Sequence, residues 1–208
     1  MDNKAEILIK LWQKKNIRGF YSPDKAHAKE RILELIPADA KVGFSGSLTL
    51  EQLGMIKSLE ARGNEVLNPY KPNLSREESL EIRRKASSAD YYLASPNAIS
   101  GNSELVFFSA YGNRIAGISY AKNVIAVAGL NKITSDLGAA IKRAREYATP
   151  LNCKRLNWQA PCLKDGICRQ AICLFPEYMR MCCQILIIEA EAIADRFRVV
   201  LVGEDLGF

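Results

Sequence analysis

Residues 123–129, which read Asn-Val-Ile-Ala-Val-Ala-Gly, decide the fold of this chain. The run is apolar without alternation, whereas a strand with one face in water alternates apolar and polar residues. Such a run is typical of a strand buried on both faces, as in a parallel sheet covered by helices. Residues 104–108, Glu-Leu-Val-Phe-Phe, have the same character and predict a second strand of this kind.

Helical and strand-like patterns alternate on both sides of this run. Ser22 with Pro23 marks one helix start, and Ser75 with Glu78 forms a capping box at another. Pro150 is expected to stop a helix. The predicted helices span 4–16, 22–37, 47–63, 75–89 and 135–148, and the predicted strands 41–44, 65–67, 90–95, 104–108, 123–129, 184–190 and 198–203. Residues 96–103 are expected to be a loop, and residues 114–119 fit either helix or strand. The alternation predicts an α/β fold with a mostly parallel sheet.

The composition is typical of a globular protein, with 48% hydrophobic and 25% charged residues among 208. No apolar run approaches the roughly 20 residues that span a bilayer, and the first residues do not resemble a signal peptide. We therefore expect a cytoplasmic protein without a membrane partner. The 29 basic residues are scattered among 23 acidic ones, which argues against a nucleic-acid partner and suits a small anionic ligand.

The turn after the first predicted sheet strand is the first candidate site. Residues 42–54, VGFSGSLTLEQLG, place Ser45, Gly46, Ser47 and Thr49 between a strand and a helix. Backbone N–H groups at such a helix start suit a phosphate or carboxylate. An ordinary capped turn explains the same residues, because the pattern is neither a dinucleotide fingerprint nor a Walker loop.

Five of the six cysteines lie between residues 162 and 183. Four thiolates can complete a zinc or iron–sulfur site, and we expect its ligands to be Cys162, Cys168, Cys173 and Cys182. Cys183 is an alternative fourth ligand, and Cys153 is expected to be structural. Reduced buried thiols and disulfides are the other two interpretations. We expect one domain over residues 1–208, with a cysteine-rich insertion at about 150–183.

Several segments together resemble the LUD domain, or lactate-utilisation, family. They are GFSGSLTLEQLG, ADYYLASPNAIS, ELVFFSAYGNRIAG, NVIAVAGLNKI, ATPLNCKRL, PCLKDGIC and VVLVGEDLGF, in the family's order and with similar spacing from about Lys25 to Phe208. The resemblance implies a doubly wound α/β sheet similar to the ribose-5-phosphate isomerase and CoA-transferase group. It also implies a role in oxidising lactate to pyruvate, beside iron–sulfur partner proteins, and it supports the cysteine-ligated metal. A homo-oligomer is left open.

The resemblance carries individual roles onto matching residues. Arg114 and Lys132 are expected to hold a carboxylate or phosphate, or to form structural ion pairs. Glu104 is expected to be a general base or nucleophile, or a solvated charge. The matching ligand-binding residues are Ser45, Gly46, Ser47, Thr49, Asn97, Asn113, Arg114, Asn131 and Lys132, and we expect at least one of the three asparagines only to hold a turn.

The chain also departs from the family pattern. Asn102-Ser103 and Ser109-Ala110 stand where the family commonly has Asp-Gly, so two carboxylates are missing near the expected site. His27, the only histidine, has no motif around it, so a Ser–His or Cys–His pair is not expected. Three hypotheses follow: a metabolite-binding protein of organic-acid oxidation, a non-catalytic assembly or binding subunit, and an isomerase or transferase acting on a phosphosugar or CoA ester.

Overall fold

A computed structural model describes residues 2–208 and contains a six-stranded sheet in the order β1-β9-β7-β4-β2-β3. Every neighbouring pair in this sheet is parallel. Its strands are β1 (Arg18–Ser22), β2 (Lys41–Phe44), β3 (Glu65–Leu67), β4 (Tyr91–Ala94), β7 (Asn123–Gly129) and β9 (Phe197–Val202). The decisive run 123–129 is β7, near the sheet centre between β4 and β9, and its apolar residues are buried as predicted.

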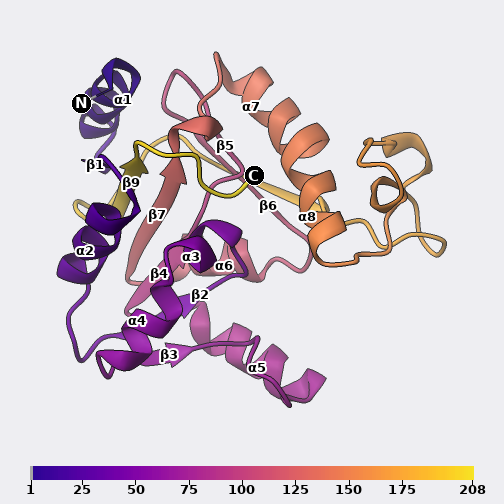
Figure 1. Ribbon diagram of the computed structural model, residues 1–208, viewed down its shortest axis with the longest axis horizontal. Helices are drawn as coiled ribbons and strands as arrows, with labels where there is room; N and C mark the ends of the chain where they lie inside the picture. Colours follow the sequence, from indigo (N-terminus) through magenta and orange to yellow (C-terminus); the bar gives the residue numbers. More distant parts are fainter. Residues whose placement is uncertain (1) are drawn as a thin grey trace.

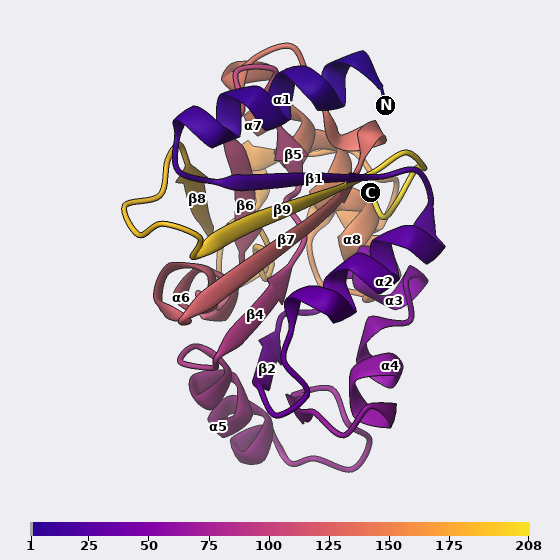
Figure 2. The ribbon, with the colours of Figure 1, turned by 90° about the vertical axis from the view of Figure 1, so that its left-hand side faces the viewer.

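Helices cover both faces of this sheet. One face packs against α2 (Lys25–Leu35), α3 (Leu48–Gln52) and α4 (Met55–Ala61), and buries Ile32, Leu50 and Leu59. The other packs against α1 (Asn3–Lys14), α5 (Arg76–Ala86) and α6 (Asn113–Tyr120), and buries Trp12 and Ile118. Figure 2 shows α2, α3 and α4 on one side of the strands and α5 and α6 on the other. The expected doubly wound parallel sheet is therefore confirmed.

A second sheet is antiparallel, in the order β5-β6-β8, and this was not predicted. It consists of β5 (Ala98–Ile99), β6 (Leu105–Ser109) and β8 (Gln184–Ile188). The run 104–108 is thus a strand, but not one of the parallel sheet. Its apolar residues are continuous because Leu105 and Phe107 pack into the main core, while Val106 and Phe108 pack against α7.

Three predicted helix limits were wrong. Residues 47–63 form two helices, because Gly54 adopts a left-handed φ of 61° between α3 and α4. Ser22 ends β1 instead of capping α2, whose N-cap is Asp24. Pro150 does not stop a helix, because it occupies the first turn of α8, where its missing N–H is tolerated.

The remaining helices follow β7 in the chain, and the last of them lie within the cysteine-rich segment. They are η1 (Leu130–Lys132), α7 (Leu137–Arg143), the π-helix η2 (Ala144–Ala148), α8 (Thr149–Arg155), η3 (Pro161–Leu163) and η4 (Gln170–Ile172). Figure 1 shows the segment after α8 projecting at the right-hand side of the molecule, beyond α8. The prediction of one domain with a cysteine-rich insertion is consistent with this layout and stays a prediction. Within residues 2–208, no helix combines the length and the apolar character needed to cross a bilayer.

The order of the strands places a crevice between β2 and β4. The chain leaves β2 through α3 and α4 towards β3, and leaves β4 in the opposite direction towards β7 and β9. In open α/β sheets, ligands bind at the carboxyl ends of strands where the order reverses in this way. A ligand site is therefore expected among the residues that follow Phe44 and Ala94.

Candidate functional site

A cavity of about 510 Å³ opens at this crevice. Its wall includes the end of β2, the start of α6, the end of β6 and one side of α8. Six of the ligand-binding residues expected from the sequence line it, namely Ser45, Gly46, Ser47, Asn97, Asn113 and Arg114. The structure thus brings together residues from three separate motifs.

Arg114 is the hub of the cavity wall. Its Nε donates to Ser45 Oγ at 3.1 Å, and its Nη2 donates to the Gly46 carbonyl at 2.8 Å. Its Nη1 donates to Asn97 Oδ1 at 3.3 Å and to the Phe108 carbonyl at 3.0 Å. The guanidinium therefore joins the ends of β2 and β4 to β6, which a planar fork of donors can do and a single ammonium cannot.

Among residues 2–208, no carboxylate forms an ion pair with Arg114. Burial lowers the pKa of Arg114 from its ordinary value. Arginine nevertheless stays charged in proteins, so the site carries an uncompensated positive charge. Three more basic residues line the cavity, Lys57, Arg83 and Arg155, against two carboxylates, Glu51 and Glu60. The cavity is therefore basic, as an anion site requires.

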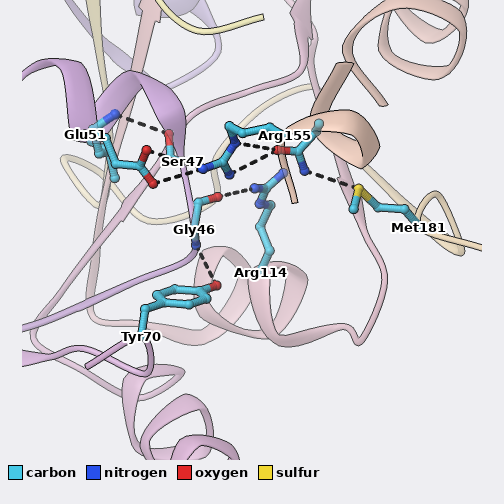
Figure 3. Close-up of polar contacts among 9 residues, drawn as sticks. Gly46, Ser47, Glu51, Tyr70, Arg114, Arg155 and Met181 are labelled. Atoms are coloured by element: carbon cyan, nitrogen blue, oxygen red, sulfur yellow. Dashed lines mark hydrogen bonds and ion pairs between the residues drawn. The ribbon is translucent and has the colours of Figure 1, made fainter. Parts of the chain in front are cut away.

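The turn itself is less free than the sequence suggested. The Gly46 N–H donates to the Tyr70 hydroxyl at 2.8 Å, and the Ser47 hydroxyl accepts from the Leu50 N–H (Figure 3). The following α3 has only five residues, so it contributes little dipole. The positive charge of the cavity comes instead from arginine and lysine side chains.

Three expected ligand-binding residues do not line the cavity: Thr49 and Lys132 are buried, and Asn131 is half-buried. Lys132 Nζ donates to Thr49 Oγ1 at 3.0 Å, to Ser95 Oγ at 2.8 Å and to the Pro96 carbonyl at 3.2 Å. Asn131 Oδ1 accepts from the Leu206 N–H at 3.2 Å. These contacts tie the carboxyl ends of the strands together, so Thr49, Asn131 and Lys132 shape the site from behind.

Glu104 lies away from the cavity, in the loop before β6. Its Oε1 stands 3.8 Å from the Nζ of Lys15, the residue that caps the C-terminus of α1. Burial would raise the pKa of Glu104, but the Ser100 hydroxyl, its own backbone and Lys15 lower it below its ordinary value. A general base working near neutral pH benefits from a raised pKa. Catalysis by Glu104 stays a prediction that this placement does not favour.

The sequence did not single out several residues that line the cavity. They are Tyr70, Arg83, Tyr111, Arg155 and Trp158. Arg83 lies on α5 and Arg155 on α8, whereas the other three lie outside the helices and strands. The family resemblance already marked ATPLNCKRL, which contains Arg155, but without a role for this residue. Tyr111 likewise stands in the marked segment ELVFFSAYGNRIAG, again without a role. Tyr70, Arg83 and Trp158 lie outside the marked segments, and only the tertiary fold brings them to the cavity.

The cysteines gather behind α8. A second, small cavity of about 20 Å³ is lined by five of them, Cys153, Cys162, Cys168, Cys173 and Cys182. Cys153, expected to stand apart, therefore belongs to the group. Cys183 lies outside it, is exposed, and donates to the Arg180 carbonyl at 2.9 Å. All six cysteines are free thiols.

The thiols that line this cavity do not have the geometry of a preformed metal site in the described part of the chain. Across residues 2–208, no three His, Cys, Asp or Glu side chains stand ready to hold a metal ion. Burial raises the pKa of Cys153, Cys168 and Cys173, so these thiols stay protonated at neutral pH. The donor set is nevertheless that of a soft metal, since thiolates are the ligands of zinc and of iron–sulfur clusters.

The two cavities share a wall. Thr149 and Met181 line both of them. On α8, Asn152 donates to Met181 Sδ at 3.2 Å, and the neighbouring Cys153 contacts the same sulfur at 3.8 Å. Arg155, two residues on, pairs with Glu51 at 3.1 Å across the first cavity (Figure 3). A rearrangement of the cysteine side chains can therefore alter the wall of the larger cavity through the contacts of α8.

Fold and cavity define the class first: a doubly wound α/β protein with a basic pocket at the carboxyl ends of its strands. Within that class, the LUD domain profile matches residues 5–202, so the chain belongs to the LUD domain family. Family membership supports a protein of the lactate-utilisation type. A search of curated proteins found no match.

One solved structure shows the same fold over nearly the whole chain. A DUF162 family protein from Deinococcus radiodurans aligns with a TM-score of 0.55 and 12% identity, covering 98% of this chain and 100% of that one. Ribose 5-phosphate isomerase A from Neisseria gonorrhoeae aligns at a TM-score of 0.35 and 16% identity over 54% of each chain. Ribose 5-phosphate isomerase from Plasmodium falciparum aligns at 0.34 and 18%, covering 53% and 52%.

Proposed function

We propose that this LUD protein binds a small organic anion in the 510 Å³ pocket and serves organic-acid oxidation in the cytoplasm, with lactate and pyruvate as the first candidates. The observation that carries the proposal is the Arg114 guanidinium, half-buried at the pocket wall without a carboxylate partner among residues 2–208. A charge withdrawn from water without a partner is costly for folding, and an anionic ligand would supply the missing partner.

Calorimetric titration tests this proposal with the intact chain. Lactate, pyruvate and ribose 5-phosphate are compared with lactamide, the neutral analogue of lactate. We expect binding of at least one anion in the millimolar range or tighter and none of lactamide, because the arginines recognise charge. Absence of binding by all the anions would refute the proposal.

A matched pair of variants locates the binding. Arg155→Gln removes a charge from the pocket wall, whereas Arg76→Gln removes one from an exposed position on α5. We expect the first to weaken anion binding about tenfold, as for loss of a charge-assisted hydrogen bond, and the second to leave it unchanged. Equal effects would place the anion elsewhere.

We also propose a thiolate-bound metal at the cysteine cavity, either zinc or an iron–sulfur cluster. The gathering of five thiols around one cavity supports it. The ligand set requires the thiols to turn inward and lose their protons, which metal binding itself drives. Zinc would stabilise the segment after α8, whereas a cluster would pass electrons to an iron–sulfur partner protein.

Metal analysis and an absorption spectrum of anaerobically purified protein distinguish these cases. Iron with a broad visible band indicates a cluster, and about one zinc per chain indicates a structural site. Neither metal, with all six thiols open to titration, would exclude both.

A second candidate function is a non-catalytic binding or assembly subunit. One observation favours it: among residues 2–208, no His or Asp lines the pocket, and Glu51 is paired with Arg155. General acid–base catalysis there would depend on Glu60, on Lys57, on the tyrosines Tyr70 and Tyr111, or on the ligand itself. Anion binding without turnover, together with co-purification of iron–sulfur partners, would support this candidate. An isomerase or transferase acting on a phosphosugar or CoA ester stays a prediction.

A further inference from the structure

The pocket is large for a three-carbon acid. Its volume of about 510 Å³ falls within the range of roughly 300–1,000 Å³ that encloses a drug-sized ligand. Lactate or pyruvate would fill only a small part of it. The rest of the wall should therefore indicate what else the ligand carries.

Five planar side chains form a continuous belt along this wall. The ring centroids of Phe44 and Tyr70 lie 6.0 Å apart, and those of Tyr111 and Trp158 lie 5.7 Å apart. The Arg83 guanidinium bridges the two pairs, 5.5 Å from the Tyr70 ring and 5.6 Å from the Tyr111 ring. All five line the pocket although they come from five separate parts of the sequence.

The belt is open towards the cavity. Tyr70 and Tyr111 are 50% and 56% exposed, which is high for aromatic side chains in a packed fold. The Nε of Arg83 is buried and has no hydrogen-bond partner within residues 2–208. Its guanidinium and the two tyrosine rings thus offer flat surfaces and a positive charge, which together favour stacking of a planar, electron-rich ring.

Gly46 connects the belt to the anion site. Its N–H donates to Tyr70 Oη at 2.8 Å, and its carbonyl accepts from Arg114 Nη2 at 2.8 Å (Figure 3). One residue therefore separates a belt ring from the charged hub. A ligand whose ring and anionic group are joined by a short linker can contact both.

We propose that the pocket binds an anion of mononucleotide size, with its phosphate or carboxylate near Arg114 and its planar conjugated ring on the belt of Tyr70, Arg83, Tyr111 and Trp158. This inference rests on the proposed anion site and names the class of ligand that the site takes. Rings stack on aromatic side chains with little regard to their identity, so the belt selects for a ring and not for one base.

Adenosine monophosphate, nicotinamide mononucleotide and flavin mononucleotide are the probes, with ribose 5-phosphate as the ringless anion and adenosine as the chargeless ring. Dissociation constants are measured by calorimetry on the intact protein. We expect at least one ring phosphate to bind about tenfold or more tightly than ribose 5-phosphate, the effect of one stacked base.

Tyr111→Leu removes a ring from the belt at a largely exposed position, where folding is little affected. Tyr120→Leu is the matched control, because it removes a tyrosine ring that is 79% exposed and lies outside the pocket. We expect Tyr111→Leu to weaken binding of the ring phosphate about tenfold and to change the dissociation constant of ribose 5-phosphate by no more than about twofold. Tyr120→Leu should change neither dissociation constant.

The inference is overturned if no ring phosphate binds more tightly than ribose 5-phosphate, or if the two tyrosine variants behave alike. Binding of ribose 5-phosphate or lactate that depends on Arg155 would then leave the proposed anion site standing. Conversely, equal binding of adenosine and its monophosphate would support the belt and refute the anion site.

Discussion

Arg114 and Gly46, 68 positions apart in the sequence, meet in a hydrogen bond of 2.8 Å from Nη2 to the backbone carbonyl. The same guanidinium also holds Ser45, Asn97 and the Phe108 carbonyl, so one side chain closes the pocket wall. The pocket therefore exists only when the parallel sheet and β6 are docked on each other.

Arg114→Lys should destabilise the fold. Lysine keeps the charge but cannot reach four acceptors with a fork, and two of those acceptors belong to the buried residues Ser45 and Phe108. We expect the free energy of unfolding to fall by about 2–4 kcal/mol, measured by urea denaturation. Arg76→Lys on the exposed side of α5 is the control, and an unchanged midpoint for Arg114→Lys would show that the hub is dispensable.

Cys182→Ser and Cys183→Ser should differ in metal content. Cys182 lines the cysteine cavity, whereas Cys183 is exposed and turned towards the Arg180 carbonyl. If the proposed metal is present, we expect Cys182→Ser to lower the metal content per chain severalfold and Cys183→Ser to keep it. Loss of metal only in Cys183→Ser would assign the fourth ligand to the other cysteine.

Cys153→Ser decides whether the cysteine of α8 belongs to the ligand set. Its position in the same cavity makes a ligand role compatible with the structure, although the sequence favoured a structural role. We expect Cys153→Ser to reduce metal content along with Cys162→Ser. Full metal content in Cys153→Ser, with lower stability, would restore the structural interpretation.

Ser103→Gly should stabilise the protein. Ser103 is fully buried, adopts a φ of 84°, and its hydroxyl has no hydrogen-bond partner in the described chain. Left-handed backbone at a residue with a Cβ, and a buried unpaired hydroxyl, each cost on the order of 1 kcal/mol. We expect a gain of about 1–2 kcal/mol in unfolding free energy, read from the urea midpoint. A lower midpoint would mean that the hydroxyl is stabilising.

Lys132 should make stability depend on pH. Burial, helped by the charges of Arg143 and Arg114, lowers the pKa of Lys132 from 10.5 to about 7. Between about pH 7 and 10.5 the unfolded chain binds the proton that the folded chain lacks, so this group makes stability rise with pH in that window.

The difference between the wild-type protein and Lys132→Met isolates this contribution from the titrating thiols. We expect the difference in unfolding free energy to change by about 1 kcal/mol per pH unit, in favour of the wild type as pH rises. Urea denaturation at pH 7, 8 and 9 measures it. A difference that stays flat across this range would show that Lys132 is charged in the folded protein.

Much of the fold could be predicted from local patterns. The buried run 123–129, the strand 41–44 and the capping box of Ser75 and Glu78 were read correctly, because periodicity and capping are local properties. The run 104–108 was assigned to the wrong sheet, since burial on both faces does not reveal which layers provide it. The break at Gly54 was missed, because a glycine in the sequence is compatible with both a helix interior and a helix end, and its left-handed φ is seen only in the structure.

The sequence by itself determined the doubly wound sheet, the family, and several residues that line the pocket, namely the turn residues 45–47 with Asn97, Asn113 and Arg114. Only the tertiary structure decided that Lys132 and Asn131 lie behind the pocket and Glu104 outside it, and that Cys153 joins the other cysteines. It alone assembled Phe44, Tyr70, Arg83, Tyr111 and Trp158 into one belt. The physical reason is that strand and helix patterns depend on neighbours in sequence, whereas a pocket wall depends on which strand ends the sheet order brings together.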